Sequence, residues 1–94
     1  MKLIKTNVQF TILFALDEYV KKIKSKEILV EIEEAMQCIE RYPSNGNTNY
    51  VIEKYIANTM VDAMNYRIEI CDEDYVDYLK EAIEFLKEEV IDKN

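Results

Sequence analysis

Residues 74–91 read DYVDYLKEAIEFLKEEVI, and this stretch decides the fold. Its apolar residues recur at alternating intervals of three and four, which places them on one face of an α-helix. Asp72 or Asp74 can cap the N-terminus, where acidic side chains also suit the positive end of the helix dipole. The stripe predicted to face the core consists of Val76, Leu79, Ile83, Leu86 and Val90.

The same spacing of apolar residues predicts three further helices. They span 7–24, 26–41 and 50–67. The single proline and the single glycine both fall in YPSNGNTN, residues 42–49, which predicts a loop there. Four amphipathic helices favour an all-α fold, an antiparallel up-and-down four-helix bundle that forms one domain over 1–94.

The N-terminal segment also allows a strand, because apolar residues alternate along 8–14. A capping box formed by Thr6 and Gln9 favours the helix. The alternative fold is α-helical with a small two-stranded pairing of 8–14 and 67–71.

The net charge is negative, and the charged residues are unevenly distributed along the chain. The chain carries a formal net charge of -7, with +4 on residues 1–26 and -11 on residues 27–94. A wide acidic surface repels nucleic acid and anionic membranes. We therefore expect a protein partner with a basic patch or groove, with no direct nucleic-acid contact and no membrane insertion.

One apolar run, residues 10–16, follows two lysines as in a secretory signal. It is short, however, and Asp17 and Glu18 close it where a small-residue cleavage site would stand. No stretch approaches the ~20 apolar residues of a membrane span. A cytoplasmic protein is the expectation.

The residue types argue against catalysis. The chain contains no histidine to act as a base or a zinc ligand, and no glycine-rich turn to hold a phosphate. Cys38 and Cys71 fit two free thiols in a reducing cytosol, with a single disulfide as the alternative. We expect no catalytic residue and no cofactor.

Two carboxylate pairs are spaced one helical turn apart, Glu31 with Glu34 and Glu69 with Asp72. This spacing resembles the pairs that hold magnesium in all-α nucleotide pyrophosphatases, where a hard cation bridges substrate phosphates. No basic phosphate-binding residue accompanies them, and solvated helix faces are the simpler interpretation. The sequence therefore predicts no metal site and no enzyme.

Recognition residues are expected on the polar flank of the C-terminal helix. Tyrosine is enriched in interface hot spots, although tyrosines can also cover a small core with their hydroxyl groups in water. The acidic side chains of the same flank would suit a basic partner. The candidate partner-binding residues are Tyr75, Tyr78, Glu81, Glu84 and Glu88.

Three segments carry a resemblance to a known family. They are ILVEIEEAMQCIE at 28–40, VIEKYIANTMVDAMNYRI at 51–68 and DYVDYLKEAIEFL at 74–86. In helix pattern and spacing the chain resembles the four-helix immunity proteins that protect bacteria from pediocin-like bacteriocins. The resemblance implies a cytosolic, non-enzymatic protein that blocks bacteriocin action at the sugar-transporter receptor. It also implies that the C-terminal helix selects the bacteriocin.

Two other functions fit the charge and size. One is a phage-encoded acidic antagonist of a host defence complex, an anti-CRISPR-like protein that occupies a nucleic-acid groove. The other is a self-associating regulatory helical module, which would form a homodimer. Salt dependence separates the first from an immunity protein, because a charge mimic loses its partner steeply as ionic strength rises. The mass in solution tests the second.

Overall fold

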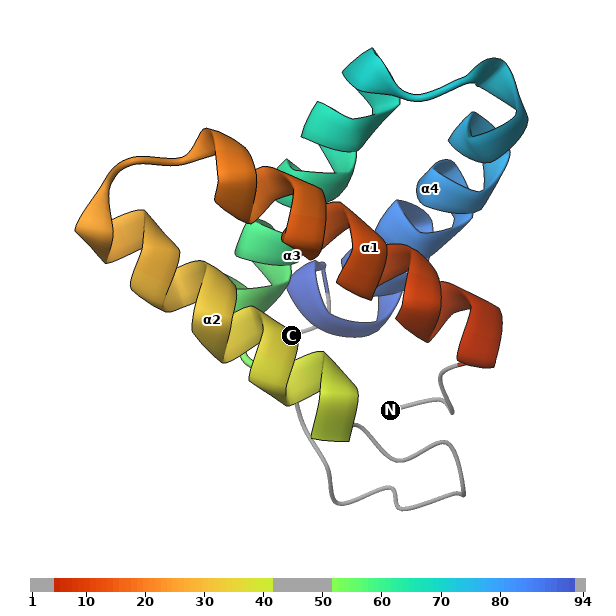
Figure 1. Cartoon of the computed structure of the whole chain (residues 1–94). Coiled ribbons are helices and arrows are strands. Elements are labelled where there is room, and N and C mark those ends of the chain that lie inside the picture. Colours follow the sequence, from red (N-terminus) through yellow and green to blue (C-terminus); the bar gives the residue numbers. More distant parts are fainter. Residues whose placement is uncertain (1–4, 42–51, 93–94) are drawn as a thin grey trace.

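A computed structural model of the chain describes residues 5–41 and 52–92 (Figure 1). Within these ranges the backbone is helical almost throughout and contains no strand. The elements are α1 (Thr6–Lys22), α2 (Lys26–Arg41), α3 (Lys54–Ile70), α4 (Glu73–Leu86) and the π-helical turn η1 (Lys87–Ile91).

α1 and α3 form the centre of the bundle. Each of them packs against α2 and against α4, and α1 crosses in front of α3 in Figure 1. α2 and α4 lie on opposite sides of this central pair, and their described backbones do not approach each other. The radius of gyration, 12.5 Å, is close to the ~12 Å of a globular domain of this length. The predicted all-α four-helix bundle is confirmed.

The alternative pairing of 8–14 with 67–71 is wrong. Residues 8–14 lie within α1, and the second segment is the last turn of α3 and the residue after it. The helical period prevails in α1 because Ile12 is fully buried, whereas Phe10 and Phe14 of the alternating set face solvent. A helix also satisfies its own backbone hydrogen bonds, while an isolated pair of strands is marginal in water.

The core contains aliphatic side chains and methionines from all four helices. Burying one large apolar side chain stabilises the fold by ~1.5–3 kcal/mol, so this shared core is the main source of stability. Val76, predicted to face the core, is only half-buried, and the buried face of α4 begins at Leu79. The largest fully buried side chains are Ile12, Leu16, Ile32, Ile39, Ile52, Met60, Met64, Leu79 and Leu86.

Helix ends differ from prediction by a few residues. α1 ends at Lys22 rather than at 24, and α3 continues to Ile70. Ile52 and Glu53 precede α3 as non-helical residues, so α3 begins later than the predicted position 50. The predicted loop at 42–49 lies outside the described residues.

The predicted capping box at the start of α1 is wrong. Lys5 occupies the N-cap position without a side-chain capping bond, and Thr6 is already helical. The Gln9 amide instead donates a hydrogen bond to the Ile39 carbonyl oxygen at 2.7 Å. Gln9 therefore ties α1 to the last turn of α2, where carbonyl groups lack helical partners.

The start of α4 is only partly as predicted. Asp72 is the N-cap residue by position, but its side chain makes no capping hydrogen bond. Glu73 and Asp74 lie in the first turn, where they favour the positive end of the dipole.

The helix predicted at 74–91 ends in a wider turn. After Leu86 the backbone continues as η1, and the Asp92 N–H donates to the Lys87 carbonyl oxygen at 2.7 Å. η1 packs against α3, and Val90 is buried there. The C-terminal turn therefore belongs to the core.

Candidate functional site

The five predicted recognition residues all lie on the solvent-exposed flank of α4 and η1. Tyr75 and Tyr78 are 53% and 54% exposed, which is high for such large rings. Glu81, Glu84 and Glu88 are also exposed. The structure divides the five between two hollows, and both hollows are shared with α1.

The first is an aromatic hollow of about 260 Å³, formed by side chains of α1, α3 and α4. Two exposed phenylalanines of α1 face the two tyrosines of α4 across it. Phe10 and Phe14 stack with ring centroids 6.2 Å apart and an interplanar angle of 22°. The residues that line this aromatic hollow are Asn7, Phe10, Thr11, Phe14, Arg67, Tyr75, Tyr78 and Leu79.

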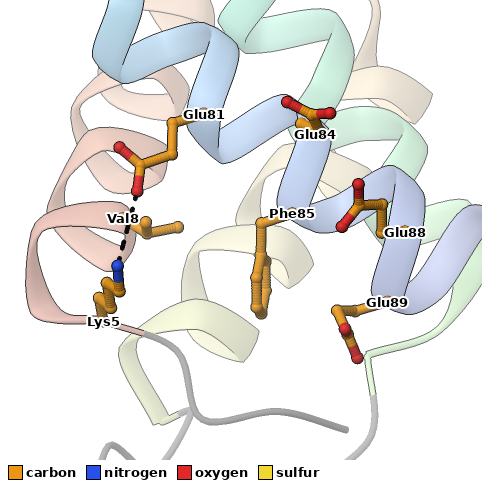
Figure 2. Close-up of a pocket in the computed structure, with 7 residues that line it drawn as sticks. All are labelled: Lys5, Val8, Glu81, Glu84, Phe85, Glu88 and Glu89. Atoms are coloured by element: carbon orange, nitrogen blue, oxygen red, sulfur yellow. Dashed lines mark ion pairs between the residues drawn. The ribbon is translucent and has the colours of Figure 1, made fainter.

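The second is an acidic hollow, shown in Figure 2, where four glutamates of α4 and η1 surround the Phe85 ring. Lys5, the N-cap residue of α1, reaches towards Glu81, and Lys5 Nζ lies 4.0 Å from Glu81 Oε1. Both side chains of this ion pair are well exposed, so it contributes little to stability. The residues that line this acidic hollow are Lys5, Val8, Glu81, Glu84, Phe85, Glu88 and Glu89.

Both hollows are lined from the α1 side and the α4 side of the seam between these helices, at different positions along them. Lys5 and Val8, at the start of α1, meet the C-terminal half of α4 and η1. Phe10 and Phe14, further along α1, meet the N-terminal half of α4. The seam is therefore aromatic near the start of α4 and acidic near its end.

Sequence reasoning missed the α1 half of this surface. The sequence places Phe10 and Phe14 in a segment that fits either a strand or a helix, yet both side chains are more than half exposed. Their spacing of four residues, offset from the buried stripe that contains Ile12 and Leu16, is the signal that indicates a second apolar face.

The other described tyrosines do not join this surface. The Tyr19 and Tyr66 rings lie 5.7 Å apart, with Lys22 Nζ 5.7 Å from the Tyr66 centroid. Burial, followed by the charge of Asp62, raises the pKa of the Tyr19 hydroxyl. These contacts are structural links between α1 and α3.

Tyr55 links α3 to α2. Its hydroxyl donates a hydrogen bond to Glu34 Oε2 at 3.0 Å, and this bond is the main cause of a raised pKa at Tyr55. Glu34 belongs to one of the two carboxylate pairs whose spacing resembles a magnesium site, and in the structure it accepts this bond. The described residues contain no group of three or more His, Cys, Asp or Glu side chains placed to hold a metal ion.

Two remaining features of the sequence can be placed. Cys38 and Cys71 are half-buried against the core and are not joined to each other by a disulfide. Of the described helices, none is both long and apolar enough to cross a bilayer.

Comparison with known protein families, with curated proteins and with solved structures gives no match.

Proposed function

We propose that this chain is a non-enzymatic binding protein of the bacteriocin-immunity type, which acts in the cytoplasm by protein–protein contact through the α1–α4 seam. The observation that carries the proposal is the set of four exposed aromatic rings, Phe10, Phe14, Tyr75 and Tyr78, around one hollow. Exposed apolar patches with polar rims mark interaction sites on soluble proteins.

Energetics support recognition at this place rather than elsewhere on the surface. Aromatic side chains bring large contact area with few rotatable bonds, which is why they dominate interface hot spots. The buried faces of α1 and α4 already fix the backbone on both sides of the aromatic hollow. A partner would therefore meet a largely formed surface, at a small cost in conformational entropy.

The test is a protection assay. The chain is expressed in a bacterium sensitive to pediocin-like bacteriocins, and the minimal inhibitory concentration is measured for a panel of them. We expect protection against at least one member. A Phe14→Ser/Tyr78→Ala variant should lose it, because both rings line the aromatic hollow.

Val30→Ser is the matched control, because Val30 is an exposed apolar residue on α2, away from the seam. It should protect as well as the unmodified chain. Folding of each variant is checked by circular dichroism. A folded, expressed chain that protects against no member of the panel would overturn the immunity proposal.

The acidic hollow supports a second proposal, an acidic antagonist that occupies a basic groove. Of the described residues, four glutamates and one lysine line this hollow. Such a charge mimic would lose its partner steeply as salt rises, whereas a contact made by the aromatic hollow would not. Partner capture measured at low and high ionic strength separates the two proposals.

A further inference from the structure

We propose that the α1–α4 seam docks a cationic amphipathic helix, with an apolar side chain in the aromatic hollow and a Lys or Arg at the acidic hollow. This inference rests on the proposed function, because it names the chemistry of the partner that uses the same seam. It goes further by fixing the partner's charge, its secondary structure and the spacing of its two anchoring side chains.

The apolar anchor follows from the aromatic hollow. Its volume, about 260 Å³, is below the roughly 300–1,000 Å³ of pockets that enclose small molecules. Its rings stand more than half exposed at the rim, and Leu79 forms part of the lining. A hollow of this size and shape suits an aliphatic or aromatic side chain inserted from a protein surface.

Charge complementarity selects a cationic occupant. Within the described part of the chain, no cation lies within ion-pair distance of Glu84 or Glu88. Lys80 of α4 and Lys87 of η1 line a further hollow on the α3 side, which Glu84 also lines, whereas Glu88 does not. Among the described residues that line the acidic hollow, four glutamates therefore stand against one cation, Lys5.

The positions along α4 determine the spacing. Tyr78 of the aromatic hollow and Phe85 of the acidic hollow are seven residues apart, which is ~10 Å along a helix. A partner helix lying along the seam would thus place its apolar and cationic anchors about two turns apart. Arg67, at the aromatic end, disfavours a second cation there and so fixes the direction of the partner.

A second copy of this chain fits the seam poorly. Each copy carries a net charge of -7, so electrostatic repulsion opposes the docking of one acidic flank against a second copy. The cationic helix instead gains attraction from the same net charge, which also accelerates association at low salt.

The test is titration calorimetry of the full chain with a synthetic helical peptide of about 18 residues, ~27 Å long. The peptide carries one leucine and, about two turns away, two lysines on the same face. Two matched peptides replace the lysines by glutamine or the leucine by serine. We expect the first peptide to bind more tightly than both.

Variants of the chain locate the contact. Glu84→Gln/Glu88→Gln should weaken the cationic peptide about 5- to 30-fold at low salt and flatten its salt dependence. Glu33→Gln/Glu40→Gln makes the same charge change on exposed residues of α2 and should leave binding within about two-fold.

Lys5→Gln gives a prediction of opposite sign. Among the described residues it removes the only cation that lines the acidic hollow, so the cationic peptide should bind about two- to five-fold more tightly. A general loss of folding could not produce this gain.

Several results would overturn the inference. They are absence of binding, equal affinity for the lysine and glutamine peptides, insensitivity to Glu84→Gln/Glu88→Gln, and a dimer in sedimentation that Phe14→Ser abolishes. The protection assay separates the two proposals. Protection that needs Phe14 but not Glu84 and Glu88 would leave the proposed function in place and remove the cationic helix.

Discussion

Two alanine substitutions in one helix separate the buried face of α1 from its exposed face. Leu16 is fully buried, so Leu16→Ala should cost ~3 kcal/mol, within the range of about 2–5 kcal/mol for such core truncations. Phe14, two residues earlier, is 59% exposed. Phe14→Ala removes partial burial and the stacking on Phe10, but alanine is the better helix former, so the net cost should stay below ~1 kcal/mol.

Urea denaturation followed by circular dichroism measures both values. A chain of this length has a free energy of unfolding of roughly 5–15 kcal/mol, so Leu16→Ala removes a large share of it. With a slope of about 1.5 kcal/mol per M, the midpoint should fall by ~2 M for Leu16→Ala and by less than ~0.7 M for Phe14→Ala. Equal losses would refute the assignment of Phe14 to a free surface, and with it the aromatic hollow as a binding site.

Three further outcomes follow from individual side-chain contacts. Gln9→Met should cost about 1 kcal/mol in urea denaturation because it leaves a helix-end carbonyl without its 2.7 Å donor, whereas Gln37→Met on the exposed face of α2 should change stability by less than ~0.5 kcal/mol. Glu34→Gln should lower the pKa of Tyr55 towards 10.0, measured by tyrosinate absorbance. Because the folded-state pKa of the Tyr55 hydroxyl is raised, its contribution to stability is intact below pH 10.0 and is lost as the pH rises through the folded-state pKa. Glu34→Gln should reduce this loss of stability at alkaline pH. Lys5→Gln should alter the free energy of unfolding by less than ~0.5 kcal/mol, since its ion pair is exposed.

The fold was predictable because a helical stripe of apolar residues must be buried to be stable. The stripe from Leu79 to Val90 identified the C-terminal helix, and the helix assigned over 26–41 matches α2. Ambiguity arose only where two periods coexist. In α1 an alternating set containing Phe10 and Phe14 overlies the helical set, and the second face it creates is part of the recognition surface.

Contacts between residues distant in sequence account for the missed partner of Gln9 and for the missed α1 half of the seam. The partner of Gln9 is 30 residues away, so the local pattern that suggests a capping box contains no information about it. The aromatic hollow brings together Phe14 and Tyr75, which lie in the first and the last of the four helices. The sequence predicted the α4 side of the seam because these residues flank the clear apolar stripe of the C-terminal helix. It did not indicate which helix would lie opposite.

The separation of α2 from α4 by the central pair, α1 and α3, also shapes how the domain opens. Each outer helix packs against the same two inner helices, and the described backbones of α2 and α4 do not approach each other. Loss of α2 by local unfolding would therefore leave the contacts that hold α4 and the seam in place, while exchange-protected amides would concentrate in α1 and α3. The two outer helices, α2 and α4, would then unfold independently of each other, and of these two only α4 contributes to the surface proposed for recognition.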